Sequence, residues 1–304
     1  MSNRVRVGAV QAEPKWLNRI AGVEQVIGYI ETAGDRGVDL LAFPETFLPG
    51  FPWWMWLKSV DWGEEFASRY LANSLAADGL ELQAIASAAN RKGVTVSLGF
   101  AERAEREVFM SQALIEPDGT ITIVRKGDPT GLERTVFARS AGGTLVRDTL
   151  CGRVGVLGGS DHWRSEISAR TRSAGEQIHI AAWSGFAHCE GDELFGPELN
   201  TSTCVRYAMD AAAYVVAPVA VVPVTGWEVV DSRIPDRRLL RGGGGVSRIL
   251  GPNGLEMAAP LAEGTEGLLV ADLDLSRTSR LTQLRRVGST LHAEPSNSRS
   301  ARAV

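Results

Sequence analysis

The first 43 residues alternate between a strand pattern and a helix pattern, and this order constrains the fold more than any other feature of the sequence. Small apolar and polar residues alternate over residues 4–11, which is typical of a β-strand. Apolar residues such as Ile20 then recur at helical spacing over residues 16–36, and Gly37 stands where a C-terminal cap is expected. A short apolar strand follows at residues 40–43. The sequence therefore predicts a β-α-β unit with a right-handed crossover.

The same kinds of element recur along the rest of the chain, together with two hairpin signals. Further helices are expected at residues 81–91, 165–174 and 201–212, and further strands at 94–100, 108–115, 121–125, 153–157, 177–182, 213–222, 247–250, 255–258 and 267–273. Pro-Asp-Gly at 117–119 and Gly-Pro-Asn-Gly at 251–254 each mark the turn of a hairpin. Strands that alternate with helices, plus hairpins, indicate an α/β layered domain with a mixed sheet or two packed sheets.

The length of the chain favours one large domain. With 304 residues, 44% of them hydrophobic, the chain can bury a large core. No linker divides it, so we expect one domain over residues 1–278. Beyond that point the sequence becomes polar and rich in Arg and Ser. The tail at residues 279–304 is therefore expected to be disordered, or ordered only against a partner subunit.

Charge and hydropathy argue against two classes of partner. The formal net charge is −4 and the charges are interspersed, which is not typical of a protein that binds nucleic acid. No apolar run approaches the roughly 20 residues that a membrane span needs. Residues 1–10 lack the apolar core of a signal peptide. We expect a cytoplasmic protein that binds neither nucleic acid nor a membrane.

Cysteine and histidine usage gives no sign of a disulfide framework or a metal centre. The cysteines, Cys151, Cys189 and Cys204, are odd in number and show no paired spacing. The four histidines are scattered along the chain. No metal or other cofactor is therefore expected.

An acid follows the buried strand at residues 40–43, and aromatic residues follow the acid. Glu45 precedes a segment that contains Phe51, Trp53, Trp54 and Trp56. A carboxylate walled by aromatic rings is partly desolvated, which raises its pKa and suits it to general acid–base catalysis near neutral pH. The alternative is an ordinary acid on an exposed loop. The rings suggest an apolar or aromatic substrate, although we expect half of them to pack in the core.

A second polar cluster follows the apolar run at residues 153–157, which is predicted to be a buried strand. Two glycines break this strand, and Ser160, Asp161 and His162 come directly after them. In layered α/β proteins the end of a central strand is where reacting groups are usually presented. Gly159 is expected at the most exposed position of this turn, yet it has no side chain.

Five segments of the sequence, in this order, resemble the nitrilase branch of the nitrilase superfamily of carbon–nitrogen hydrolases. They are FPETFLPGFPWWMW (43–56), RKGDPTGLERTVF (125–137), GRVGVLGGSDHW (152–163), GEQIHIAAWSGF (175–186) and GGGGVSRILGPNG (242–254). Together they span nearly the whole chain up to about residue 275.

The resemblance implies an α-β-β-α sandwich that acts on a small molecule and forms a homodimer or a larger homo-oligomer. It also implies a catalytic Glu-Lys-Cys triad with a second glutamate. By position, Glu45 is the general base and Lys126 stabilises charge on the substrate nitrogen or oxygen. Glu133 is the supporting acid, and Trp183 lies where the family builds another wall of the pocket.

The chain departs from the family at the nucleophile. The position of the family's cysteine holds Gly159, followed by Ser160, Asp161 and His162. Cys151 lies before the strand, and the other two cysteines belong to other segments. Near the C-terminus, Arg285-Arg286-Val287-Gly288 stands where the family has an acidic segment, which affects substrate closure and oligomer contacts.

Three functions are compatible with this departure, because glycine cannot form the covalent intermediate that a thiolate holds. In the first, Glu45 activates water or a second substrate, while Lys126 and backbone amides near Gly159 and Ser160 stabilise the developing anion. Hydration, hydrolysis, elimination or condensation at a C–N or N–N bond all fit. The second is a non-catalytic binding or scaffold protein. The third is a hydrolase in which Ser160 is the nucleophile.

Each polar residue after Gly159 also has a structural interpretation. Ser160 is expected to be an N-cap of the helix that follows, and Asp161 a first-turn acid on its dipole. His162 either lines the pocket or is a packed, hydrogen-bonded residue.

Overall fold

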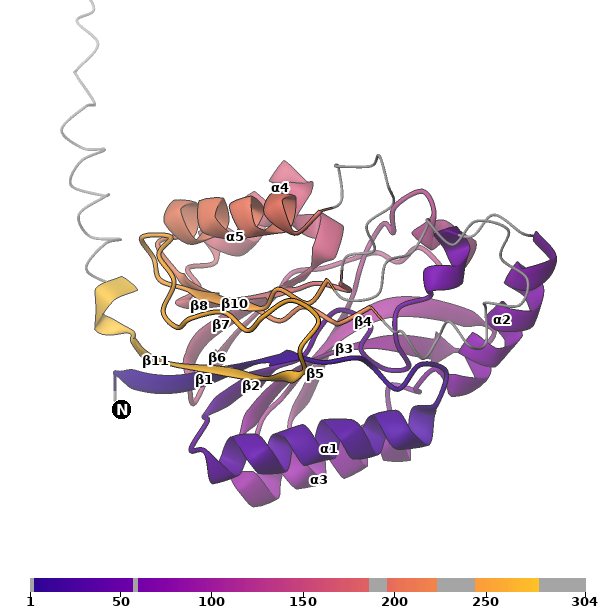
Figure 1. The fold of residues 1–304 in the computed structure, drawn as a ribbon, viewed down its shortest axis with the longest axis horizontal. Helices are drawn as coiled ribbons and strands as arrows, with labels where there is room; N and C mark the ends of the chain where they lie inside the picture. Colours follow the sequence, from indigo (N-terminus) through magenta and orange to yellow (C-terminus); the bar gives the residue numbers. More distant parts are fainter. Residues whose placement is uncertain (1–2, 57–59, 186–195, 223–243, 279–304) are drawn as a thin grey trace, which may run out of the picture.

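The computed structural model describes residues 3–56, 60–185, 196–222 and 244–278 (Figure 1). The strands are β1 (Arg4–Gln11), β2 (Leu40–Ala42), β3 (Thr95–Ala104), β4 (Glu107–Ile115), β5 (Ile121–Arg125), β6 (Leu145–Thr149), β7 (Gly152–Gly158), β8 (Ile178–Ala182), β9 (Tyr214–Ala217), β10 (Arg248–Leu250) and β11 (Gly267–Asp274). The helices are α1 (Arg19–Asp35), α2 (Val60–Asn73), α3 (Leu80–Lys92), α4 (Ser165–Ser173) and α5 (Pro197–Ala211), with short 3-10 helices η1 (Trp53–Trp56), η2 (Glu133–Thr135) and η3 (Gly159–Trp163).

The strands form two sheets of mixed direction. One sheet has the order β11-β1-β2-β3-β4-β5, and the other has the order β10-β9-β8-β7-β6. In the first sheet β1, β2 and β3 run parallel, and the β4–β5 hairpin extends the sheet with antiparallel pairs. In the second sheet β7, β8 and β9 run parallel. The predicted β-α-β opening and the predicted hairpin at 108–125 are therefore confirmed.

The two sheets pack face to face, and each is covered on its outer face by helices (Figure 1). Apolar residues of α1 and α3, such as Ile30 and Leu82, pack with Leu98 of β3 on the outer face of the first sheet. Residues such as Val7 and Val154 form the layer between the sheets. Helix α5 covers the second sheet together with α4. The four-layer α-β-β-α sandwich is thus confirmed.

Several elements differ from those that the sequence patterns predict. Helix α1 begins at Arg19, because the side chain of Asn18 caps it by accepting from the amide of Ala21. Ile20 is 71% exposed, since it lies in the first turn and faces away from the sheet. The predicted strand at 213–222 ends at Ala217.

The second predicted hairpin forms in part. Strand β10 is present, but Glu256 makes a single bridge to Leu250 in place of a second strand. Strand β6 and helix α2 were not predicted. The predicted tail at 279–304 lies outside the described residues. Among the helices that are described, none is long and apolar enough to cross a membrane.

Candidate active site

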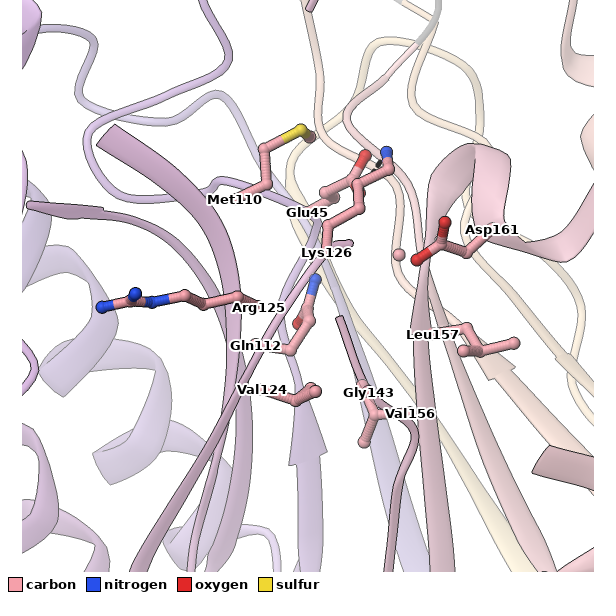
Figure 2. Close-up of a pocket in the computed structure, with 11 residues that line it drawn as sticks. Glu45, Met110, Gln112, Val124, Arg125, Lys126, Gly143, Val156, Leu157 and Asp161 are labelled. Atoms are coloured by element: carbon pink, nitrogen blue, oxygen red, sulfur yellow. Dashed lines mark hydrogen bonds and ion pairs between the residues drawn. The ribbon is translucent and has the colours of Figure 1, made fainter. Parts of the chain in front are cut away.

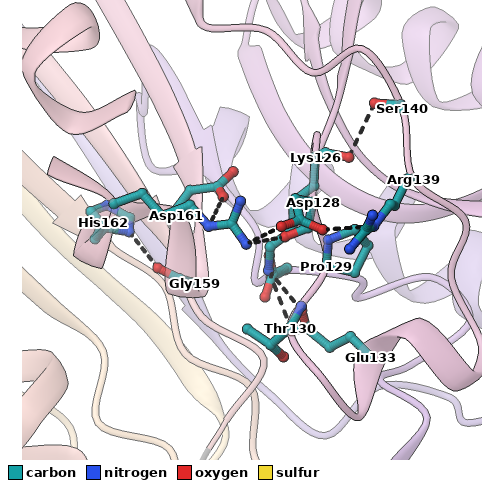
Figure 3. Close-up of polar contacts among 12 residues, drawn as sticks. Lys126, Asp128, Pro129, Thr130, Glu133, Arg139, Ser140, Gly159, Asp161 and His162 are labelled. Atoms are coloured by element: carbon teal, nitrogen blue, oxygen red, sulfur yellow. Dashed lines mark hydrogen bonds and ion pairs between the residues drawn. The ribbon is translucent and has the colours of Figure 1, made fainter. Parts of the chain in front are cut away.

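Three residues that the sequence singled out lie together between the two sheets (Figures 2 and 3). Glu45 follows β2, Lys126 follows β5 and Glu133 begins η2. The ammonium of Lys126 donates to Glu45 Oε1 at 3.2 Å and to Glu133 Oε1 at 3.3 Å. Glu133 also accepts from the amide of Thr130 at 2.6 Å, which fixes its carboxylate. All three charged residues are buried, so the cluster is an ion triad shielded from bulk water.

The electrostatics of this triad single out Glu45 as the group that exchanges a proton near neutral pH. Burial raises the pKa of Glu45 to about 7, and the attraction of Lys126 offsets only part of that effect. Burial also opposes the charged forms of Lys126 and Glu133. For these two residues, however, the opposite charges outweigh burial, so the pKa of Lys126 is raised and that of Glu133 is lowered. Lys126 and Glu133 therefore stay charged while Glu45 titrates.

The backbone of Gly158 and Gly159 packs directly against the carboxylate of Glu45. A Cβ atom at Gly158 would lie 2.2 Å from Glu45 Oε1, and one at Gly159 would lie 2.7 Å from Oε2. Gly159 also has a φ of +25°, which side-chain-bearing residues rarely adopt. The expectation that Gly159 is the most exposed position of the turn is wrong, because Glu45 and η3 bury it.

Ser160 and Asp161 lie inside η3, which begins immediately after β7. The N-cap of η3 is Gly158 and that of α4 is Arg164, so the prediction that Ser160 caps a helix is wrong. Ser160 is the second residue of the 3-10 helix η3, so it lies inside a helix and not at the N-cap of one. The buried hydroxyl of Ser160 has no hydrogen-bond partner among the described residues. The prediction that Asp161 lies in the first turn of the following helix is also wrong, because Asp161 belongs to η3 and α4 begins at Ser165. Burial raises the pKa of Asp161.

His162 is a packed, hydrogen-bonded residue, which is one of its two predicted interpretations. Its Nδ1 lies 2.8 Å from the carbonyl oxygen of Gly159 (Figure 3), and its Nε2 lies 2.9 Å from Nε2 of His179. Its ring stacks on Trp183, with ring centroids 5.0 Å apart. Trp183 is itself buried behind His162, in the layer that α5 covers.

The aromatic residues after Glu45 pack among themselves. Phe51, Trp53 and Trp54 are buried in one apolar cluster, where Trp54 contacts Trp16, Phe66 and Tyr70. Half of these rings were expected to pack in the core, whereas all three of the described ones do. The side chain of Trp56 lies outside the described residues.

A cavity of about 20 Å³ adjoins the triad (Figure 2). Its polar lining includes Glu45, Lys126, Gln112 and Asp161. Apolar side chains of both sheets line the rest of the cavity. Oε1 of Gln112 is buried and accepts no hydrogen bond within the described part of the chain. Gln112 was not predicted, because its orientation toward the cavity depends on the β3–β4 register, which pairs it with Gly99.

Asp128 is a second residue that sequence reasoning missed. Its carboxylate lies 2.9 Å from Arg134, 3.0 Å from Arg139 and 3.2 Å from Arg164 (Figure 3). The pair with Arg164 joins the loop after Lys126 to the segment after η3. The acid–arginine spacing in RKGDPTGLER could have indicated the pair with Arg134, but not the one with Arg164.

The two described cysteines lie away from Glu45. Cys151 precedes β7, at the end of the strand opposite to Gly159, and its thiol donates to the carbonyl of Asp39 at 3.3 Å. Burial raises the pKa of this thiol to about 11. Cys204 is buried on α5, where its sulfur accepts from the indole of Trp183. Burial raises the pKa of Cys204 to about 12. Cys189 lies outside the described residues.

The described residues contain no group of three or more His, Cys, Asp or Glu side chains that could hold a metal ion. The arrangement instead offers a proton acceptor, a fixed cation and a small polar space between them. Such a site can move a proton and stabilise negative charge on a bound molecule.

Comparisons of the sequence find a matching family model and related proteins. The family model described as carbon-nitrogen hydrolase matches residues 6–283. A nitrilase from Pseudomonas syringae pv. syringae is 36% identical over 90% of this chain and 82% of its own length. An arylacetonitrilase from Aspergillus kawachii is 38% identical over 91% and 85%, and an aliphatic nitrilase from Rhodococcus rhodochrous is 35% identical over 90% and 76%.

Solved structures show the same fold at lower identity. A CN-hydrolase superfamily protein from Xanthomonas campestris superposes with a TM-score of 0.71 at 16% identity, covering 96% of this chain and 98% of its own. An amidase from Nesterenkonia, with the acetamide moiety of fluoroacetamide added to its active-site cysteine, gives a TM-score of 0.67 at 17% identity over 93% and 96%.

Proposed function

Because the chain belongs to the carbon–nitrogen hydrolase family, we propose that it is an enzyme that attacks a C–N bond of a nitrile-like or amide-like small molecule, or an N–N bond, by acid–base catalysis without a cysteine nucleophile. The observation that carries this proposal is the buried Glu45–Lys126–Glu133 triad, in which Glu45 has a pKa of about 7. A sandwich fold needs no such triad, because burying three charges costs desolvation free energy.

Each member of the triad has a distinct role in the proposed reaction. Glu45 removes a proton from the attacking group, since a base is most effective when its pKa is near the working pH. Lys126 stabilises negative charge that develops on the substrate nitrogen or oxygen. Glu133 holds the ammonium of Lys126 in place and keeps it protonated.

The attacking group in this proposal is water or the nucleophile of a second substrate. Gly159 supplies no side chain, and the thiols of Cys151 and Cys204 are engaged elsewhere with raised pKa values. The cavity beside Glu45 has about 20 Å³, which is enough for one water molecule. The carboxylate of Glu45 and Oε1 of Gln112 provide two acceptors for its protons.

A hydrolase that uses Ser160 is the second candidate. The observation that favours it is the buried Ser160 hydroxyl, which makes no hydrogen bond within the described residues and is therefore free to act. Serine requires a base within hydrogen-bond reach, and the Ser160 hydroxyl makes no hydrogen bond to Glu45. We therefore place this mechanism second, and Ser160→Ala distinguishes it from the first.

Turnover of a substrate panel by matched variants tests the proposal. Nitriles, primary amides, activated amides and hydrazides are incubated with the wild type, Glu45→Gln, Ser160→Ala, Cys189→Ala and Glu166→Gln, and products are followed by mass spectrometry. Glu166 is an exposed acid on α4, so its variant makes the same chemical change away from the site. We expect turnover by the wild type, Ser160→Ala, Cys189→Ala and Glu166→Gln, and loss of turnover in Glu45→Gln.

The other outcomes are equally informative. Loss of turnover in Cys189→Ala would overturn the cysteine-free mechanism, and loss in Ser160→Ala would favour the serine mechanism. Absence of turnover by the wild type on every compound, with binding of one of them by calorimetry, would favour a binding protein that keeps the family fold.

A further inference from the structure

A chain of four buried polar side chains runs from the α5 layer to the backbone of Gly159. The hydroxyl of Tyr207 donates to Glu176 Oε1 at 2.5 Å, and Glu176 Oε2 lies 2.8 Å from His179 Nδ1. The Nε2 atoms of His179 and His162 are 2.9 Å apart, and His162 Nδ1 lies 2.8 Å from the Gly159 carbonyl. All four side chains are at most 7% exposed. This series of hydrogen bonds ends on Gly159, the glycine that packs against Glu45.

The chemistry of the final carbonyl fixes the direction of these hydrogen bonds. A carbonyl oxygen can only accept, so the proton of His162 must be on Nδ1. Burial lowers the pKa of His162 to about 3, so the ring is neutral and its Nε2 has no proton. His179 must then donate from its own Nε2. One further proton remains between His179 Nδ1 and Glu176 Oε2, whichever of the two atoms holds it.

The surrounding residues are shaped to admit this chain. A Cβ atom at Gly155 of β7 would lie 1.7 Å from Glu176 Oε2, so a side chain there would displace the carboxylate. The ring of His179 stacks on Tyr207 with centroids 3.8 Å apart, and the ring of His162 stacks on Trp183. Buried polar groups are costly unless all are bonded, and here both ring nitrogens of each histidine have a partner. The surrounding packing and the complete bonding of both histidines therefore fit this particular series of hydrogen bonds.

We propose that His162, held by His179 and Glu176, is a positioning residue that orients the Gly159–Ser160 peptide for the reaction at Glu45. This inference rests on the proposed function. The carbonyl of Gly159 and the amide of Ser160 belong to one trans peptide, so they point in opposite directions. The hydrogen bond from His162 to the Gly159 carbonyl therefore orients the Ser160 N–H away from the histidine pair. The same hydrogen bond polarises the peptide and makes this N–H a stronger donor. That N–H then joins Lys126 as a donor to the negative charge on the reacting substrate.

The protonation pattern can be tested without a substrate. The full-length protein is labelled with ¹⁵N-histidine, and the four histidines are assigned by substitution. At pH 7 we expect His162 to carry its proton on Nδ1 alone and His179 to carry one on Nε2. A doubly protonated His162, or a His162 with its proton on Nε2, would overturn the proposal whether or not the protein is an enzyme.

Two conservative variants separate positioning from packing. In His162→Asn the side-chain amide takes the place of Nδ1 and can still donate to the Gly159 carbonyl. In His162→Gln the amide takes the place of Nε2, so this hydrogen bond is lost. With the substrate found in the panel, we expect His162→Gln to lower kcat about 10- to 100-fold with little change in KM, and His162→Asn to retain most of kcat. The amide proton of Ser160 should shift upfield in His162→Gln and stay near its wild-type position in His162→Asn.

Equal loss of kcat in the two variants, or an unchanged Ser160 amide shift in His162→Gln, would show that His162 only fills space, and would overturn the proposal. Absence of any turnover by the wild type would instead count against the proposed function. In that case the histidine protonation and the Ser160 amide shift still decide whether the chain of hydrogen bonds holds the peptide.

Discussion

Two buried polar clusters lie on either side of Gly159, and they differ in how completely they are bonded. On one side, Glu45 shares a single cation with Glu133, and the adjoining cavity contains acceptors without a donor among the described residues, such as Gln112 Oε1. On the other side, both nitrogens of His162 and His179 and both oxygens of Glu176 are bonded. The first cluster has an adjoining cavity and an acceptor that is not bonded, and the second has its ring nitrogens and carboxylate oxygens fully paired. A reaction centre needs the first kind of arrangement, and a rigid support needs the second.

The largest expected effect comes from removing the one cation of the first cluster. Lys126→Met leaves Glu45 and Glu133 buried without an opposite charge. We expect a loss of about 3–5 kcal/mol in the free energy of unfolding, and a fall in turnover of at least about 100-fold. Urea unfolding and initial rates measure the two effects.

The matched control is Lys92→Met, which breaks only the exposed ion pair with Asp35. It should cost no more than about 1 kcal/mol, because water already screens that pair. Equal losses in the two variants would mean that the triad contributes no more than an ordinary surface pair, and the contrast between the clusters would fail.

The next effect is a pH dependence that belongs to Glu45. Its pKa rises from 4.5 to about 7 on folding, so between these values the unfolded chain loses a proton that the folded chain keeps. Stability should therefore fall by about 1.4 kcal/mol per pH unit in this window, and level off at each end. Turnover should rise with pH through about 7 as the base ionises.

Urea unfolding at several pH values checks this in the wild type and in Glu45→Gln. The variant has no titrating carboxyl at this position, so the difference between the two stability curves should show the slope. Parallel curves from pH 5 to 8 would show that Glu45 is ionised throughout, in contradiction to its burial.

Substitution of Gly159 should have a smaller but site-specific effect. Because a Cβ atom there would lie 2.7 Å from Glu45 Oε2 and φ is +25°, we expect Gly159→Ala to cost about 2 kcal/mol and to displace the carboxylate. Gly159→Cys should cost a similar amount and gain a thiol that iodoacetamide labels. Gly28→Ala on α1, where nothing lies within 4 Å of the added atom, should be neutral or stabilising. A stable Gly159→Ala with unchanged turnover would contradict the contact with Glu45.

Much of the fold was predictable because it depends on local patterns. The β1–α1–β2 opening and the β4–β5 hairpin follow from periodicity and turn residues, and they also place Glu45 and Lys126 at strand ends. The end of β9 at Ala217 was not predictable, because the apolar run continues past the last residue of the ladder with β10, and Val219 makes only an isolated bridge to Trp183.

The candidate site was predictable only in its individual residues. Glu45, Lys126 and Glu133 were identified from motifs, but the burial of Gly159 depends on a side chain from more than 100 positions earlier. Gln112 is oriented by strand register, and the partnership of Glu176, His179 and His162 depends on the contact between η3 and β8. Such contacts between distant segments leave no periodic signal in a single sequence.

The smallest expected effect comes from Glu176→Gln in the histidine cluster, which makes the same chemical change as Glu45→Gln in the catalytic cluster. Glu176→Gln keeps the shape of the side chain, accepts from Tyr207 through its oxygen and donates to His179 Nδ1 through its amide. Because His179 can still donate from Nε2, His162 keeps its proton on Nδ1, and we expect a cost of about 1 kcal/mol with most of the turnover retained. Glu176→Leu removes these partners and should lower both stability and kcat. Glu45→Gln is expected to abolish turnover in the same assay. A comparably large loss in Glu176→Gln would mean that a proton moves along the series of histidine hydrogen bonds during the reaction. The histidine cluster would then take part in the proton transfer that we assign to Glu45 alone.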